Sequence, residues 1–189
     1  MSIRAGILAV LTASEAYGLQ LHSELEERTD RAGRINVGQI YSTLDRLCTA
    51  GLVEVSGSTD DGLPLYGLSP AGVSEAEEWL ATPEVGSLTA WTDMTFKLLL
   101  ATSLRGDGAA ALVQRYRDAW LTEAASAGVG DGHRDGDGEG EDAATRARAR
   151  LAVAALGWLD DLETLPGGLA ALARPLRNER PRRGRRPSA

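Results

Sequence analysis

The sequence predicts a mainly α-helical protein that contains one small β-hairpin. Over most of the 189 residues, apolar side chains recur at steps of three and four, the spacing of a helix with one buried face. One stretch differs, because two short apolar runs flank the segment SGSTDDG. This density of turn-forming residues is typical of a hairpin, so we expect helices on both sides of a single pair of strands.

Two helices are expected before residue 31. The first covers residues 2–13 and the second residues 17–30, with the segment SEAYG between them. Apolar side chains at helical spacing are expected to face inward: Ile3, Ile7, Leu8 and Leu11 in the first helix, Leu21 and Leu25 in the second. The charged side chains of the second helix are expected to face solvent: Glu24, Glu26, Glu27 and Arg28.

A third helix is expected over residues 36–50. Ile40, Leu44 and Leu47 follow the spacing that packs a helix on a core. Asn36 is a favourable N-cap, and Ala50-Gly51 provides a C-terminal stop. The other side carries small polar groups where lysine and glutamate would be usual for solubility: Gln39, Tyr41, Ser42, Asp45 and Arg46. Such a face suits a partner that approaches closely.

The hairpin follows directly. One strand begins with Leu52 and Val53, the other covers residues 63–68, and Ser69-Pro70 then starts a fourth helix that runs to about Thr82. Three short helices followed by a hairpin is the order of elements in a winged helix-turn-helix module.

The second half of the chain is expected to be helical, over residues 91–104, 109–127 and 143–165. Residues 128–142 are rich in Gly and Asp, which predicts a flexible loop. The apolar residues of the last helix recur at steps of 4, 3, 4 and 3, a heptad-like seam: Leu151, Ala155, Trp158, Leu162 and Leu165. A short seam of this kind predicts a bundle or dimer contact, in which we place Leu151, Trp158 and Leu162.

Three regions with different charge follow from these assignments. Residues 1–82 form the winged helix-turn-helix domain, residues 83–173 a helical dimerisation and effector domain, and residues 174–189 a basic disordered tail. The whole chain has a net charge of −7, but the tail carries seven Arg and one Glu, so it holds +6 and the remainder −13. A basic tail of this kind is typical of an arm attracted to nucleic acid.

Several classes of function are disfavoured by the sequence. The single Cys48 cannot form an internal disulfide, and no segment approaches the roughly 18 consecutive apolar residues of a membrane span, so we expect a cytoplasmic protein. One Cys and two distant His form no metal-ligand cluster. No nucleophile–base set or phosphate-binding Gly loop is present, so we expect neither an enzyme nor a cofactor.

Three segments of the sequence resemble the PadR-type transcriptional regulators. They read ILAVLTASEAYGLQLHSELEER, INVGQIYSTLDRLCTAGLVE and LYGLSPAG. The pattern of that family falls on Gly38, Ile40, Tyr41, Leu44, Arg46, Leu47, Gly51, Leu52 and Val53, then on Tyr66, Leu68, Ser69 and Gly72. The resemblance covers residues 3–82, and extends more loosely through DMTFKLLLA and LGWLDDLETL to a longer subgroup with an extended dimerisation domain.

This resemblance implies a homodimeric repressor that binds an inverted repeat in double-stranded DNA and is released by a small molecule. The residues themselves favour the same DNA contact, because a helix of about 14 residues, roughly 21 Å long, can enter a major groove about 12 Å wide. Asn36 and Gln39 can pair with adenine edges, and Ser42 and Thr43 are short enough to permit approach. Phosphate contacts are expected from the remaining candidates: Tyr41, Arg46, Arg31 and Arg34.

The charge of the first 82 residues departs from this pattern. Five Arg stand against twelve acidic residues, a net of −7, and the hairpin turn carries Asp60 and Asp61 with no basic residue. Because phosphate neutralisation supplies much of the affinity for DNA, we expect Arg28, Arg31, Arg34 and Arg46 to gather on one face and the tail to add cations. The alternative is an acidic winged-helix module that docks a basic protein and no longer binds DNA specifically.

The helical second half is the expected place for an effector. Trp91, Tyr116 and Trp120 can line a pocket for a planar aromatic ligand, whereas the alternative is that they only pack in the core. The ligand can act with either sign, since one that strengthens DNA binding would use the same fold.

Overall fold

The computed structural model describes residues 2–31, 34–87, 89–126 and 143–177 of the chain, and it falls into two compact units. One unit, the winged-helix unit, comprises Ile3–Glu77 together with the segment that begins at Arg174. The other, the helical unit, comprises Glu78–Ala173 with the N-terminal dipeptide. The expected loop 128–142 lies outside the described residues.

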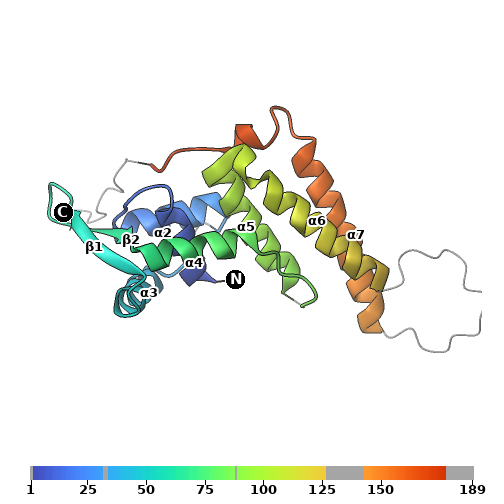
Figure 1. The fold of residues 1–189 in the computed structure, drawn as a ribbon, viewed down its shortest axis with the longest axis horizontal. Helices are drawn as coiled ribbons and strands as arrows, with labels where there is room; N and C mark the ends of the chain where they lie inside the picture. Colours follow the sequence, from blue (N-terminus) through green and yellow to red (C-terminus); the bar gives the residue numbers. More distant parts are fainter. Residues whose placement is uncertain (1, 32–33, 88, 127–142, 178–189) are drawn as a thin grey trace, which may run out of the picture. The chain divides into compact units, whose positions relative to one another are not determined.

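The winged-helix unit contains the expected order of elements (Figure 1). Its helices are α1 (Ile3–Leu11), α2 (Gly18–Arg28) and α3 (Val37–Thr49), followed by the strands β1 (Val53–Ser58) and β2 (Pro64–Leu68) and by α4 (Pro70–Ala81), which begins in this unit. The strands pair antiparallel, with Val53 opposite Leu68 and an irregularity between Val55 and Gly57. A mainly α fold with a small β-hairpin wing is thus confirmed.

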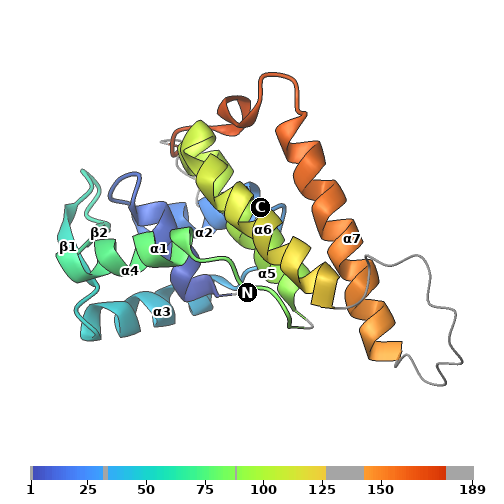
Figure 2. The same cartoon turned by 45° about the vertical axis from the view of Figure 1, so that its right-hand side comes forward.

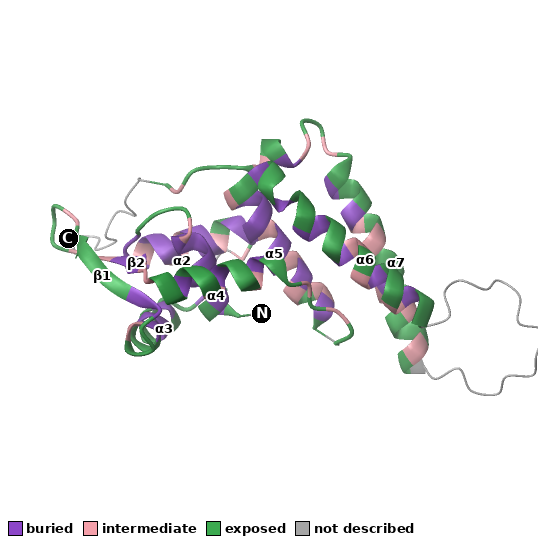
Figure 3. Cartoon of the chain, viewed as in Figure 1, coloured by how far each residue is buried: buried purple, intermediate pink, exposed green. Residues whose placement is uncertain are grey.

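The core of this unit is made by the apolar stripes of the three short helices (Figure 3). Ile7, Leu21, Ile40 and Leu44 are fully buried, as their spacing predicts. The wing joins this core through Ala16, whose backbone N–H and C=O both bond to Tyr66 at 3.1 and 3.0 Å. The connection between α1 and α2 therefore acts as a minimal third strand.

The helical unit contains α5 (Ala90–Arg105), the short 3₁₀ helix η1 (Gly106–Ala109), α6 (Ala110–Ser126), α7 (Ala143–Glu163) and η2 (Leu169–Leu172). Helices α6 and α7 run side by side (Figures 1 and 2). Met94, Phe96, Tyr116, Trp120 and Leu159 are fully buried between these elements. None of the described helices is long and apolar enough to cross a membrane.

The buried stripe of α7 is displaced from the expected seam. Ala152, Ala155, Leu159 and Leu162 are buried, whereas Leu151, Trp158 and Leu165 are only half-buried. The two stripes share Ala155 and Leu162, so periodicity alone could not distinguish them. Leu162 is consequently buried within the single chain. Leu151 and Trp158 remain partly exposed, as a dimer contact would require.

Candidate nucleic-acid interface

Helix α3 presents the small polar face that its sequence predicts. Gln39, Ser42 and Arg46 are exposed, while Leu47 on the opposite side is 1% exposed. Asn36 is the N-cap, because its Oδ1 accepts a hydrogen bond from the backbone N–H of Gly38 at 2.7 Å. Asn36 is exposed, but its amide oxygen is already engaged by the helix.

The polar groups of this face are partly satisfied by the helix itself. The Ser42 hydroxyl donates to the carbonyl of Gln39 at 3.2 Å. The Arg46 guanidinium folds back along α3, with Nε donating to the Ser42 carbonyl at 3.0 Å. The Arg46 side chain is therefore held close to the helix surface, where it remains exposed.

Thr43 does not belong to this face, which corrects the expectation. It is 5% exposed, and it lies on the inner stripe because it is three residues after Ile40 and four before Leu47. Its hydroxyl accepts a long hydrogen bond of 3.4 Å from Arg46. Thr43 thus supports the arginine instead of facing a groove.

Tyr41 is partly exposed and also packs against α2. Its side chain is 39% exposed, yet its ring lies directly over Gly18 at the start of α2. A Cβ at Gly18 would come within 2.6 Å of the Tyr41 ring, so only glycine leaves room for this contact. Tyr41 therefore fixes α3 against α2 and still exposes its edge.

The connection between α2 and α3 is held by His22 and by Glu26, which was expected to face solvent. His22 Nε2 lies 2.8 Å from the carbonyl of Ile35, and Glu26 accepts a hydrogen bond of 3.3 Å from the Ile35 N–H. Ile35 immediately precedes the N-cap of α3, so His22 and Glu26 set where the helix begins. Their i, i+4 spacing on α2 was the only signal in the sequence.

The expected cluster of cations is smaller than predicted. Arg34 is exposed and Arg31 half-buried, both within the α2–α3 connection. Arg28 is 3% exposed and forms a buried ion pair of 2.6 Å with Glu24, so neither residue faces solvent as expected. Burial lowers the pKa of the Arg28 guanidinium, although Glu24 opposes this effect. Arg28 is thus excluded from any contact with DNA.

Glu24 and Arg28 are buried because residues 174–177, which we call the strap, lie across α2. Arg28 donates to the carbonyls of Arg174 and Pro175 at 3.0 and 2.9 Å. Glu24 accepts from the Arg177 N–H at 2.6 Å, and Gln20 donates to the Arg177 carbonyl at 2.8 Å. The expected disordered tail therefore begins with a four-residue segment that is bound to α2 through Arg174, Pro175 and Arg177, and its remainder, residues 178–189, lies outside the described part.

The wing carries no cation that could contact phosphate. Its turn is closed by Thr59, whose hydroxyl donates to Asp61 at 2.5 Å and accepts from the Leu63 N–H at 3.0 Å. Val55 on β1 is 60% exposed. The acidic turn is therefore closed by its own hydrogen bonds, and Asp60 and Asp61 are both exposed to solvent.

The expected effector residues are brought into one unit but do not share one surface. Trp120 is buried, and its Nε1 lies 3.0 Å from the sulfur of Met94. Tyr116 is also fully buried, which raises the pKa of its phenol, and its hydroxyl finds no partner in hydrogen-bond geometry among the described residues. Trp91 is half-buried and packs edge-on against Trp158 at 5.8 Å.

The helical unit contains a buried lysine that was not predicted from the sequence. Lys97, the single lysine of the chain, is 1% exposed on α5. Its ammonium donates to the Thr82 carbonyl at 2.6 Å and to Glu84 at 3.2 Å, and it lies 4.6 Å from the centre of the Trp79 ring. Burial lowers its pKa, and Glu84 opposes that effect. Lys97 thus ties the segment after α4 to α5.

Three short helices, the third with an exposed polar face, followed by a two-stranded wing define a winged helix-turn-helix module. The family model described as "Transcriptional regulator PadR-like family" matches residues 7–78, which run from α1 into α4. Residues 7–78 of the chain therefore resemble the PadR-like family of transcriptional regulators. No curated protein sequence matched the chain.

Three solved structures match most of the chain's length. Bacillus subtilis PadR in complex with operator DNA is 17% identical, with 84% of this chain and 94% of that chain covered and a TM-score of 0.40. The same protein in complex with p-coumaric acid is 17% identical, with 90% and 98% covered and a TM-score of 0.39. A structure of B. subtilis PadR alone is 16% identical, with 91% and 97% covered and a TM-score of 0.36. Because these TM-scores are low, the family assignment depends on the match over residues 7–78.

Proposed function

We propose that this protein is a homodimeric, sequence-specific repressor that inserts α3 into the major groove of operator DNA. The observation that carries the proposal is the exposed polar face of α3 inside a region that resembles a family of transcriptional regulators. Gln39, with Asn36 beside it at the N-terminal end of α3, is the base-reading candidate. Arg46, Tyr41, Arg31 and Arg34 are proposed to contact phosphates.

The dimer determines the form of the operator. Two copies of α3 related by a twofold axis require a pseudo-palindrome whose half-sites lie about 10 or 20 base pairs apart, one or two turns of the duplex. DNase footprinting on the promoter upstream of the chain's own gene tests this geometry. Two protected half-sites at such a spacing support the proposal, whereas a single unrepeated site contradicts it.

A planar aromatic effector bound in the helical unit is the proposed signal for release. The half-buried Trp91 favours such a ligand, since a planar aromatic compound can stack on its exposed ring surface. Tyr116 is fully buried and is proposed to line the site from within. Trp120 is proposed to shape the floor of that site. Quenching of tryptophan fluorescence by a panel of phenolic compounds, compared with Trp91→Phe, tests the assignment.

A second candidate function is a docking module for a basic protein, and the acidic wing favours it. Residues 1–82 have a net charge of −7, and the structure removes Arg28 from the set of available cations. Mobility shifts at two salt concentrations distinguish the functions. Specific binding that weakens steeply with salt supports the repressor, whereas a lack of specific binding at low salt supports the docking module.

A further inference from the structure

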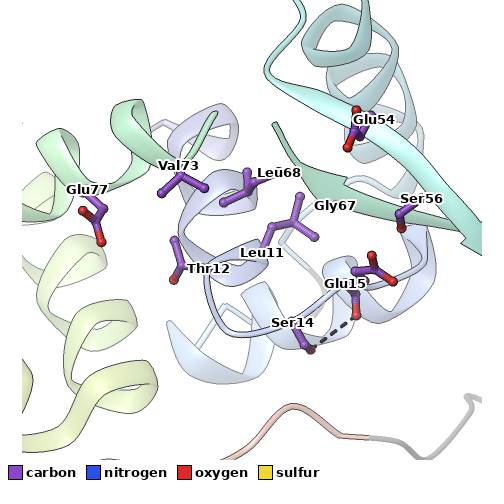
Figure 4. Close-up of a pocket in the computed structure, with 10 residues that line it drawn as sticks. All are labelled: Leu11, Thr12, Ser14, Glu15, Glu54, Ser56, Gly67, Leu68, Val73 and Glu77. Carbon is purple, nitrogen blue, oxygen red and sulfur yellow. Dashed lines mark hydrogen bonds between the residues drawn. The ribbon is translucent and has the colours of Figure 1, made fainter. Parts of the chain in front are cut away.

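A groove with a volume of about 360 Å³ opens on the winged-helix unit (Figure 4). It lies between the α1–α2 connection, the two strands of the wing and the first turns of α4. Leu11, Leu68 and Val73 line it with apolar surface, while Glu15, Glu54 and Glu77 bring a carboxylate from each of three elements. The volume is at the lower end of the ~300–1,000 Å³ of ligand pockets.

The groove is suited to an elongated cation. Among the described residues it is lined by no basic side chain, and neither Glu15 nor Glu54 forms an ion pair with another of these residues. Glu15 lies across Gly67 of β2, where a Cβ would come within 3.5 Å of its side chain. Carboxylates around an apolar floor match arginine, which buries its aliphatic stem and keeps its charged head among acceptors.

The strap brings a cationic segment of the same chain toward this groove. It runs antiparallel to α2, because Arg174 and Pro175 bond to Arg28 at the end of the helix and Arg177 bonds to Gln20 near its start. The residues just before α2 include Ser14 and Glu15, which line the groove. The carbonyl of Arg177, the last described residue, is thus held toward the end of α2 that adjoins the groove, while its N–H and guanidinium bond to Glu24 and Glu27 further along the helix.

The length and charge of the remaining segment fit the groove. Residues 178–189, which we call the arm, are twelve residues with five Arg and one Glu. Twelve extended residues reach up to about 40 Å, whereas the five residues from Gln20 to Glu15 span at most about 18 Å. The arginines of the arm can therefore reach the groove at Glu15 without any release of the strap.

We propose that the arm docks in cis in this groove, with its arginines paired to Glu15, Glu54 and Glu77. The acidic surface around the wing is then a seat for the chain's own basic arm. The same arginines are the cations that we expect to add to the phosphate contacts of α3. While they are docked in the groove they cannot contact DNA, until a duplex competes for them. This last consequence rests on the proposed function, whereas the docking itself does not.

Paramagnetic relaxation in the full-length protein without DNA tests the docking. A nitroxide is attached at Ser188→Cys in a Cys48→Ser background, and backbone amide peaks are recorded with the label oxidised and reduced. We expect selective loss of peak intensity at Ser14, Glu15 and Gly67, and recovery of intensity at high salt because exposed ion pairs are screened. The variant Glu15→Gln/Glu54→Gln/Glu77→Gln should abolish the loss.

The matched control removes the same charge elsewhere, at three exposed aspartates: Asp60→Asn, Asp107→Asn and Asp161→Asn. It should keep the intensity loss, which separates groove docking from a general effect of net charge. Uniform or absent intensity loss, or loss that persists in the glutamine variant, overturns the proposal. Loss seen only when labelled chains are mixed with isotopically enriched, unlabelled ones shows docking between copies and overturns the cis assignment. Because no DNA is present, none of these results depends on the operator.

Discussion

At the scale of single residues, Gln39 and Arg46 should differ in what their loss does to DNA recognition. Gln39 is free to meet a base edge, so Gln39→Ala should reduce discrimination against a changed base by about 1–3 kcal/mol. Arg46→Ala should weaken all sequences alike and lower the salt slope by about one. Mobility shifts on operators with single base changes measure both. An equal loss on every operator for Gln39→Ala would refute base reading.

The contact between Gly18 and Tyr41 gives a second prediction at this scale. Gly18→Ala should destabilise the chain because the new methyl group displaces the Tyr41 ring. In a Tyr41→Ala background the same substitution should be neutral or stabilising, since the space is then empty and alanine favours a helix. Urea unfolding of the four proteins gives the coupling, expected at about 0.5–3 kcal/mol. Additive effects would show that the ring does not pack there.

The same residues show what a sequence can and cannot predict. The buried stripe of Ile40, Leu44 and Leu47 was predictable because it depends only on the local helical period. Thr43 lay within that stripe by spacing, and its polar side chain obscured the fact. Glu24 and Arg28 were unpredictable, because their burial depends on partners about 150 residues away.

At the scale of elements, the strap should be a major support of α2. Arg28→Ala leaves Glu24 buried without its cation, and losing one partner of a buried pair costs about 3–5 kcal/mol. Arg28→Lys should recover only part of the lost free energy of unfolding. One ammonium group cannot replace the guanidinium, which bonds to Glu24 and to two carbonyls at the same time. Arg177→Ala is the control, because its pair with Glu27 is more exposed and should contribute within about 1 kcal/mol. Equal losses for Arg28→Ala and Arg177→Ala in urea unfolding would contradict this account.

Helix α5 makes a prediction about pH through Lys97. Burial lowers the pKa of Lys97 in the folded chain below its ordinary value of 10.5, so the unfolded chain binds this proton more tightly. Stability contributed by this group therefore rises as the pH increases toward 10.5. Relative to Lys97→Met, the natural protein should gain free energy of unfolding over that range, because other titrating groups cancel in the comparison. A constant difference would show that Lys97 is not desolvated.

The elements also differ in how far sequence could place them. The helices and the wing followed from periodicity and turn residues, and their order was correct. The sequence could not predict which side of α7 is buried, because two overlapping apolar stripes fit the helical period. Only the packing against α6 selects one of them. The residues of the expected dimer contact could not be placed from the sequence for the same reason, since they depend on which stripe remains exposed.

At the scale of the whole molecule, the distribution of charge is the property that sets DNA affinity. The winged-helix sequence is acidic, Arg28 is buried, and five of the remaining arginines lie in the arm. A chain ended after Arg177 keeps the strap and loses only the arm. Each phosphate contact contributes about 0.9 to the logarithmic salt slope, so this truncation should flatten the slope by up to about four or five and weaken binding most at low salt.

Replacing the three groove glutamates with glutamine should strengthen DNA binding, the opposite of the effect of the truncation. With Glu15, Glu54 and Glu77 replaced by Gln, the arm has no competing seat, so DNA binding should tighten while the salt slope stays at least as steep. Measuring the glutamine substitutions in both the full chain and the truncated chain distinguishes an effect of the arm from an effect of the lost acidic charge. If the arm mediates the effect, the glutamine substitutions tighten binding more in the full chain than in the truncated one. If repulsion between the acidic groove and phosphate mediates it, both chains tighten equally, and the arm then has no part in setting affinity through the groove.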